Sequence, residues 1–92
     1  MKKIKKNTLS DILKQSRNKL NMSQGDLAKT LGYTSPQFIS NWERGISSPP
    51  LKTICKLVNV LSLDPDEVIE VMLIEEEKTL RKALETRARK YK

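Results

Sequence analysis

Residues 23–45 read SQGDLAKTLGYTSPQFISNWERG. Ser23 and Asp26 stand three residues apart, which is the spacing of a capping box at the start of a helix. The apolar residues that follow recur at helical spacing, and Gly32 stands where a helix end favours a left-handed residue. The pattern predicts a short helix over residues 24–31.

A second short helix is predicted over residues 36–44. Ser35 is its expected N-cap, and Pro36 occupies the first helical position, where the missing N–H costs nothing. Ile39 and Trp42 fall on one face of this helix and are expected to point inward. The stretch therefore predicts two helices joined by a tight turn.

The outward face of the second helix carries two amides, a hydroxyl and a guanidinium, and no carboxylate. These side chains belong to Gln37, Asn41, Ser40 and Arg44. Amide side chains can bond adenine bidentately in the major groove, and arginine can bond guanine in the same way. Two helices set by a short turn, the second with such a face, are typical of the helix-turn-helix. We expect these four residues to read bases in double-stranded DNA.

The same stretch resembles a known family. SQGDLAKTLG followed by ISNWERG is similar to the DNA-binding domain of phage repressors and Cro-type (Xre-type) regulators, and the resemblance covers residues 9–68. The turn GYTSP is one residue longer than the family's usual turn. The resemblance implies an all-α, five-helix repressor-like domain. It also implies a sequence-specific transcriptional regulator, a repressor, that binds paired half-sites as a homodimer.

One further role follows from this resemblance, and others follow from the residues themselves. In the family, an arginine of the first helix pairs with the glutamate before the closing Arg-Gly, which implies an ion pair between Arg17 and Glu43; a solvated Arg17 is the alternative. Gln24 begins its helix, where a side chain and free N–H groups suit a phosphate oxygen, unless it is a plain surface residue. The other residues expected to hold the DNA backbone are Ser35, Ser47, Ser48 and Lys52.

Charge is distributed unevenly along the chain. Residues 1–62 carry eleven Lys and Arg against three acids, whereas residues 63–92 carry seven against eight. The basic excess lies in the half that holds the two-helix stretch, which suits the phosphates of DNA, although a solubility charge is the alternative. Residues 1–7 include four lysines and form a basic arm, which is either a frayed terminus or an arm along the DNA.

Three further helices complete the expected domain, residues 8–74. Thr8 is expected to cap the first of them, and Pro65 to open the last, which meets no stop signal before the chain ends. The fourth helix, residues 51–61, is expected to bury Leu51, Ile54, Cys55, Val58 and Leu61. Residues 75–92 form a charged helical extension, in which the acidic run 75–77 reads as a solvated face.

A thin apolar stripe runs along the last helix and is either idle surface or a contact to a second chain. It comprises Ile69, Leu73, Leu80, Leu84 and Tyr91, interrupted by Glu76 and Glu77. Val68 and Met72 are expected to cover the core. The predicted dimer interface comprises Val68, Met72, Leu73, Leu80, Leu84 and Tyr91.

The composition argues against catalysis and metal binding. The chain has no His and one Cys, and it has no Gly-rich phosphate loop. We therefore expect neither an enzyme, nor a metal site, nor a cofactor. A lone thiol fits a reducing cytosol, and no apolar stretch approaches the length of a membrane span, so a cytoplasmic protein is expected. Two alternatives stay open: the antitoxin of a toxin–antitoxin pair, or a protein-interaction adaptor without base readout. A toxin or an antirepressor is a further expected partner.

Overall fold

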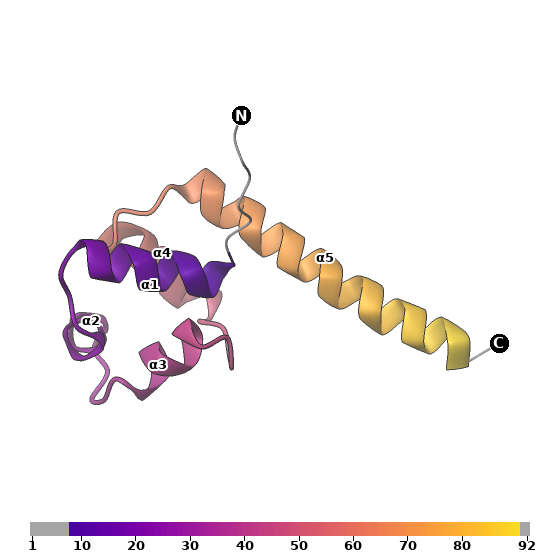
Figure 1. Ribbon diagram of the computed structural model, residues 1–92, viewed down its shortest axis with the longest axis horizontal. Helices are drawn as coiled ribbons and strands as arrows, with labels where there is room; N and C mark the ends of the chain where they lie inside the picture. The colour runs from indigo at the N-terminus through magenta and orange to yellow at the C-terminus, as the bar shows by residue number, and fades with distance from the viewer. Residues whose placement is uncertain (1–7, 91–92) are drawn as a thin grey trace.

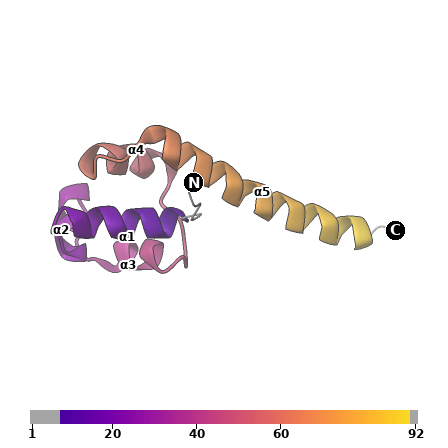
Figure 2. The same cartoon turned by 45° about the horizontal axis from the view of Figure 1, so that its top comes forward.

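The computed structural model describes the backbone of residues 8–90 and the side chains of residues 8–86. This part of the chain folds into five helices and contains no strand: α1 (Leu9–Lys19), α2 (Gln24–Leu31), α3 (Gln37–Glu43), α4 (Leu51–Val60) and α5 (Pro65–Lys90). Helices α1 to α4 gather at one end, and α5 runs away from them as a single rod (Figures 1 and 2). The predicted five-helix, all-α fold with an extended last helix is confirmed. The basic arm 1–7 and Tyr91 lie outside the described residues.

Two capping boxes start the first two helices. At α2, the N–H of Asp26 donates to Oγ of Ser23 at 2.9 Å, and the N–H of Ser23 donates to the Asp26 carboxylate at the same distance. Thr8 and Asp11 make the same reciprocal pair at α1. Backbone and side-chain hydrogen bonds from Ser23 lower the pKa of Asp26. Each box satisfies two of the N–H groups that a helix start leaves free.

Each of the first four helices ends in a residue with positive φ. These residues are Asn21, Gly32, Gly45 and Ser62, with φ of 59°, 89°, 74° and 54°. In each case the next N–H donates back across the turn: Met22 to Arg17, Tyr33 to Ala28, Ile46 to Asn41 and Leu63 to Val58. This is the Schellman closure, which the sequence predicts where Gly or Asn is available. Ser62 was not predicted, because serine rarely adopts this conformation.

Helix α3 begins one residue later than predicted. Pro36 lies at the N-cap position with φ −80° and ψ 4°, and no side chain caps the helix from there. Oγ of Ser35 nevertheless accepts the N–H of Gln37 at 3.2 Å. Ser35 thus satisfies a free donor of the helix start, as an N-cap does, from one position further out.

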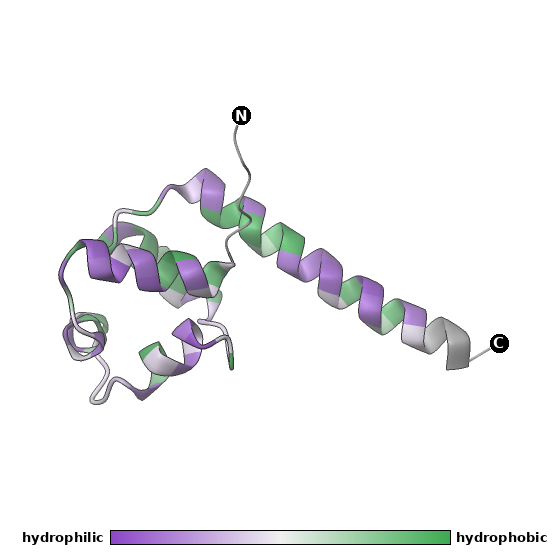
Figure 3. Cartoon of the chain, in the orientation of Figure 1, coloured by the Kyte–Doolittle hydropathy of each residue, from purple (hydrophilic) through white to green (hydrophobic). Residues whose placement is uncertain are grey.

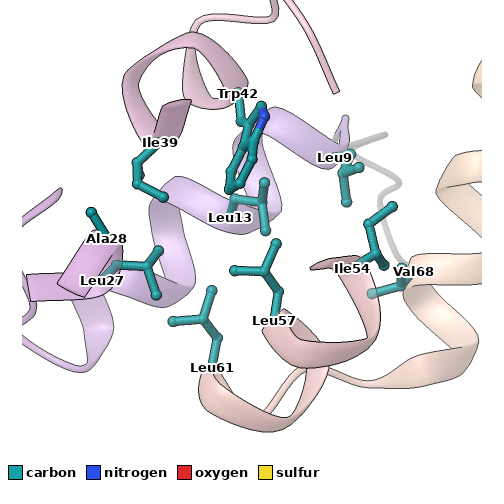
Figure 4. Close-up of a cluster of buried hydrophobic side chains, with 10 residues drawn as sticks. All are labelled: Leu9, Leu13, Leu27, Ala28, Ile39, Trp42, Ile54, Leu57, Leu61 and Val68. Carbon is teal, nitrogen blue, oxygen red and sulfur yellow. The ribbon is translucent and has the colours of Figure 1, made fainter. Parts of the chain in front are cut away.

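The core joins all five helices (Figure 4). It comprises Leu9, Leu13, Leu27, Ala28, Ile39, Trp42, Ile54, Leu57, Leu61 and Val68. Leu57 of α4 is 0 % exposed and lies near its centre. Val68 belongs to this cluster and Met72 packs against it, so the first turns of α5 close the core, as predicted. Burial of each such aliphatic side chain contributes about 1.5–3 kcal/mol.

Helix α4 is rotated relative to the prediction. Leu51 is 70 % exposed and Cys55 is also exposed, so the expectation that both are buried is wrong. The buried face is centred on Leu57, with Ile54 and Leu61 on either side. At about 100° per residue, Cys55 lies roughly 160° around the helix from Leu57. A face that includes Leu57 therefore cannot include Cys55.

A carboxylate of α5 caps the start of α1. Oε2 of Glu75 accepts the N–H of Leu9 at 2.9 Å, and the Glu75 side chain is half-buried. This N–H is the first of those that α1 cannot satisfy within itself. Glu75, which we expected in a solvated acidic run of the extension, is therefore bonded to the first helix of the domain, while the boundary after residue 74 stays a prediction.

We expect Glu75→Ala to lower the free energy of unfolding by about 1 kcal/mol, the usual cost of losing a cap. The matched control is Glu76→Ala, which removes an exposed neighbour and should change stability by less than about 0.5 kcal/mol. Thermal and urea unfolding followed by circular dichroism measure both. If both variants lost the same free energy of unfolding, the hydrogen bond between Glu75 and Leu9 would not contribute to stability.

Candidate nucleic-acid interface

An ion pair connects α1 to the end of α3. Nε of Arg17 donates to Oε2 of Glu43 at 2.6 Å, and Nη2 of Arg17 donates to Oε1 at 2.9 Å. Nη1 of Arg17 donates to the carbonyl of Met22 at 2.7 Å. The two charged side chains are only 9 % and 3 % exposed. The structure therefore brings together the two residues that the resemblance paired, in a bidentate and desolvated geometry.

Gln24 completes this cluster from the start of α2. Its Nε2 donates to Oε1 of Glu43 at 3.0 Å, and the side chain is half-buried. The structure thus gives this amide a different partner from the phosphate oxygen that the sequence suggests. Glu43 accepts three hydrogen bonds from two helices, which fixes the end of α3 against α1 and α2.

Hydrogen bonding decides the charge state of the cluster. Burial alone would raise the pKa of Glu43, but the hydrogen bonds from Arg17 and Gln24 and the charges of Arg17 and Lys14 outweigh it, so the pKa lies below its usual value. The hydrogen bond to Glu43 in turn raises the pKa of Arg17. Both groups are therefore charged at neutral pH, and α3 presents no free carboxylate.

A pH-dependent contribution to stability follows from the lowered pKa of Glu43. A carboxyl whose pKa is lower in the folded state stabilises the fold above its unfolded value, about 4.3. That stability is lost as the pH falls through the folded pKa. We expect the gap in unfolding free energy between the wild type and Glu43→Gln to be full at pH 6 and to shrink toward pH 3. Urea titrations across this range measure it, with Glu76→Gln as control; a constant gap would contradict the shift.

The outward face of α3 is organised by one amide. Oδ1 of Asn41 accepts Nε2 of Gln37 at 3.0 Å and Nη2 of Arg44 at 3.1 Å. Three of the four predicted base-reading residues are thereby joined in one row along the helix. Gln37 and Arg44 are exposed, whereas Asn41 and Ser40 are half-buried.

These hydrogen bonds determine which donors and acceptors of the row remain free to bind a ligand. The acceptor of Asn41 is engaged twice, and among the described residues its amino group makes no hydrogen bond. Oε1 of Gln37 and the remaining N–H groups of Arg44 are likewise available. Nε2 of Gln37 also keeps one N–H, since it donates only once. The row therefore presents one acceptor and three groups of donors, and no negative charge.

An aromatic cluster packs the turn between α2 and α3. The ring centroid of Tyr33 lies 5.0 Å from that of Phe38 and 5.9 Å from that of buried Trp42. Phe38 is 53 % exposed, so it covers Trp42 from outside rather than entering the core. The turn between α2 and α3 thus supplies a ring of its own that packs against α3. Sequence reasoning missed Tyr33, because a tyrosine in a turn carries no periodic signal.

The residues expected to contact phosphate are placed on the surface. Ser35 precedes α3, Ser47 and Ser48 follow it, and Lys52 lies in the first turn of α4; all four are exposed. Within residues 8–86, no group of His, Cys, Asp and Glu side chains is arranged to hold a metal ion. No helix of the described chain is both long enough and apolar enough to cross a membrane.

Comparison with known families gives one match. Residues 13–68 match the family model described as "Helix-turn-helix", over more than half of the 92-residue chain. The matched region runs from the middle of α1 to the first turn of α5 and contains the Arg17–Glu43 pair, the row on α3 and the loop after it. No curated protein and no solved structure matches the chain.

Proposed function

The chain belongs to the helix-turn-helix family of Xre/Cro-like DNA-binding regulators, and from this premise we propose that it is a sequence-specific repressor that binds paired half-sites as a homodimer. The observation that carries the proposal is the hydrogen-bonded row of Gln37, Asn41 and Arg44 on the outward face of α3. Base-specific binding needs directed donors and acceptors, whereas binding to phosphate needs only positive charge. The protein acts in the cytoplasm and needs no cofactor.

In this proposal, α3 lies in the major groove and reads bases through the row. The amino group of Asn41 and the guanidinium of Arg44 donate, and the matching acceptors are guanine O6 and N7 or thymine O4. Oε1 of Gln37 accepts, and the matching donors are adenine N6 and cytosine N4. Ser40 precedes Asn41 in the chain, and its hydroxyl can bond either kind of group.

Positive charge and hydroxyl groups beside α3 hold the DNA backbone. Ser35, Ser47 and Ser48 flank the helix, and Lys52 follows at α4. Their exposure leaves their polar groups open to phosphate oxygens. Gln24 acts mainly through Glu43, and it contacts phosphate only with the groups that this bond leaves free.

Only part of the predicted dimer interface is accessible. Val68 is 3 % exposed and Met72 packs on the same core, so these two side chains contact their own domain and are not free to contact a second chain. Leu73, Leu80 and Leu84 are between 50 % and 64 % exposed. We place the contact to a second chain on these three residues.

Truncation tests this placement. A chain that ends at Glu77 keeps the Glu75 cap and the core, so we expect it to stay folded by circular dichroism. It should sediment as a monomer. It should also lose more affinity for a site with two half-sites than for a single half-site. A truncated protein that sediments as the full-length dimer would place the interface elsewhere.

Selection of bound duplexes from random DNA tests the function itself. We expect a preferred sequence of two inverted half-sites, because a two-fold dimer reads both strands alike. Enrichment of no sequence, together with steep salt dependence on all DNA, would favour the adaptor that uses the fold without reading bases.

A further inference from the structure

The exposed apolar residues of α5 lie on one face of the helix. Ile69, Leu73, Leu80 and Leu84 are 54 %, 64 %, 50 % and 64 % exposed. At about 100° per residue, they fall within roughly 60° of one another around the helix. Figure 3 shows green patches recurring along α5 beyond the point where it leaves the domain. This apolar face lies on the side away from Val68 and Val71, which the domain buries.

The outer part of α5 is open to solvent as far as the structure describes its side chains. All residues from Glu76 to Thr86 are exposed, and Figures 1 and 2 show this segment projecting away from α1 to α4. Most helical stability in proteins comes from packing of an apolar face rather than from intrinsic propensity. A projecting helix with an unpartnered apolar face is therefore the form expected of one half of an interface.

The distribution of charge along α5 indicates which partner fits this apolar face. Within α5, residues 65–77 carry six acids and no base, whereas residues 78–90 carry six bases and one acid. Complementing the helix dipole would explain acids in the first turn and bases in the last, since its effect falls off within a turn. It does not explain a division that extends over the whole helix. Two parallel copies would set like charges side by side, and two antiparallel copies set each acidic half against a basic half.

We propose that α5 pairs with α5 of a second copy in antiparallel orientation, with the two-fold axis between residues 76 and 79. In this range Leu73 packs on the partner's Leu80 or the partner's Leu84, and the arrangement is self-complementary, as a two-fold interface requires. Arg81 then lies level with the acidic half of the partner's helix. This pairing assumes that the protein is a homodimer, as the proposed function states, but it does not depend on base reading.

Disulfide cross-linking distinguishes the two orientations in DNA-free, full-length protein. Cys55 is exposed and is first replaced by Ser. Glu77→Cys places a thiol near the axis, so the two thiols of an antiparallel dimer meet and a covalent dimer is expected on mild oxidation. In a Leu84→Cys dimer the two positions are about 15–24 Å apart along the helix, and no covalent dimer is expected.

A mixed sample shows whether the Leu84→Cys thiol can form a disulfide at all. Leu84→Cys protein is combined with tagged Leu73→Cys protein, and antiparallel pairing brings these positions within about 8 Å along the helix. A mixed disulfide dimer is therefore expected, although Leu84→Cys alone gives none. Equal cross-linking of Glu77→Cys and Leu84→Cys alone would show parallel helices, and cross-linking in none of the samples would place the interface elsewhere. Either result overturns the proposal, while DNA selection with the wild type tests the reading function separately.

Discussion

Replacing Glu43 with alanine is expected to lower the free energy of unfolding by about 3–5 kcal/mol. Removal of one partner of a desolvated ion pair leaves the other charge buried and uncompensated. Here the residue left behind is Arg17, whose side chain is only 9 % exposed. The loss of Gln24's acceptor adds to the cost. Urea unfolding of the two proteins measures the difference.

The chain contains its own control for this prediction. Glu77 and Arg81 form a second ion pair, at 2.8 Å, but these side chains are 61 % and 68 % exposed. Glu77→Ala should change the unfolding free energy by less than about 1 kcal/mol, since solvent screens an exposed pair. If both glutamate variants lose the same stability, burial does not determine the strength of the Glu43 pair.

A double-mutant cycle separates the pair from its surroundings. Arg17→Ala and Glu43→Ala should each be strongly destabilising, and the double variant should lose much less than their sum, because it leaves neither charge unpaired. Additive losses would show that the two side chains do not interact. The cycle also bears on DNA binding, because a free Glu43 carboxylate at the end of α3 would repel phosphate.

Asn41→Ala and Gln37→Ala should each weaken binding to the preferred DNA site by about 1–3 kcal/mol, roughly 5- to 150-fold, which is the value of a good base contact. We expect the larger loss for Asn41, because Gln37 and Arg44 both donate to its oxygen. Loss of this acceptor frees two further side chains as well as removing one contact. The loss for the double variant should be smaller than the sum of the single losses, since the residues belong to one network.

The control for this prediction is a variant that affects all DNA alike. Lys52→Ala removes a proposed phosphate contact, so it should weaken binding to the preferred site and to random duplex by the same factor. The two amide variants should leave binding to random duplex almost unchanged. Fluorescence anisotropy titrations at one fixed salt concentration compare the three proteins. If the amide variants lost the same affinity for both kinds of DNA, Gln37 and Asn41 would not read bases.

Local chemistry made much of this fold predictable. The two capping boxes depend on residues three positions apart, and the left-handed helix ends at Gly32 and Asn21 depend on residue types that favour them. Such signals are contained within a few residues of sequence. They fixed the helix starts and ends to within about one residue, as the short displacement of α3 to Gln37 shows.

The remaining features depend on contacts between distant parts of the chain. Glu75 caps Leu9 across 66 residues, and no pattern near either residue signals this bond. Cys55 was misplaced because several apolar residues of α4 fit more than one helical face, and only packing of Leu57 against the other helices selects one. The polar face of α3 was predicted, but the engagement of Asn41 as the shared acceptor depends on rotamers that sequence does not specify.

The most direct measurement is the ratio of two dissociation constants for the wild-type protein. One is for the duplex selected from random DNA, and the other is for a duplex with the same composition in scrambled order, both at the same physiological salt concentration. Base reading by α3 predicts that the selected duplex binds at least about 10³-fold more tightly, the lower end for specific DNA-binding proteins. A ratio near one, with both constants rising equally steeply with salt, would contradict sequence-specific recognition.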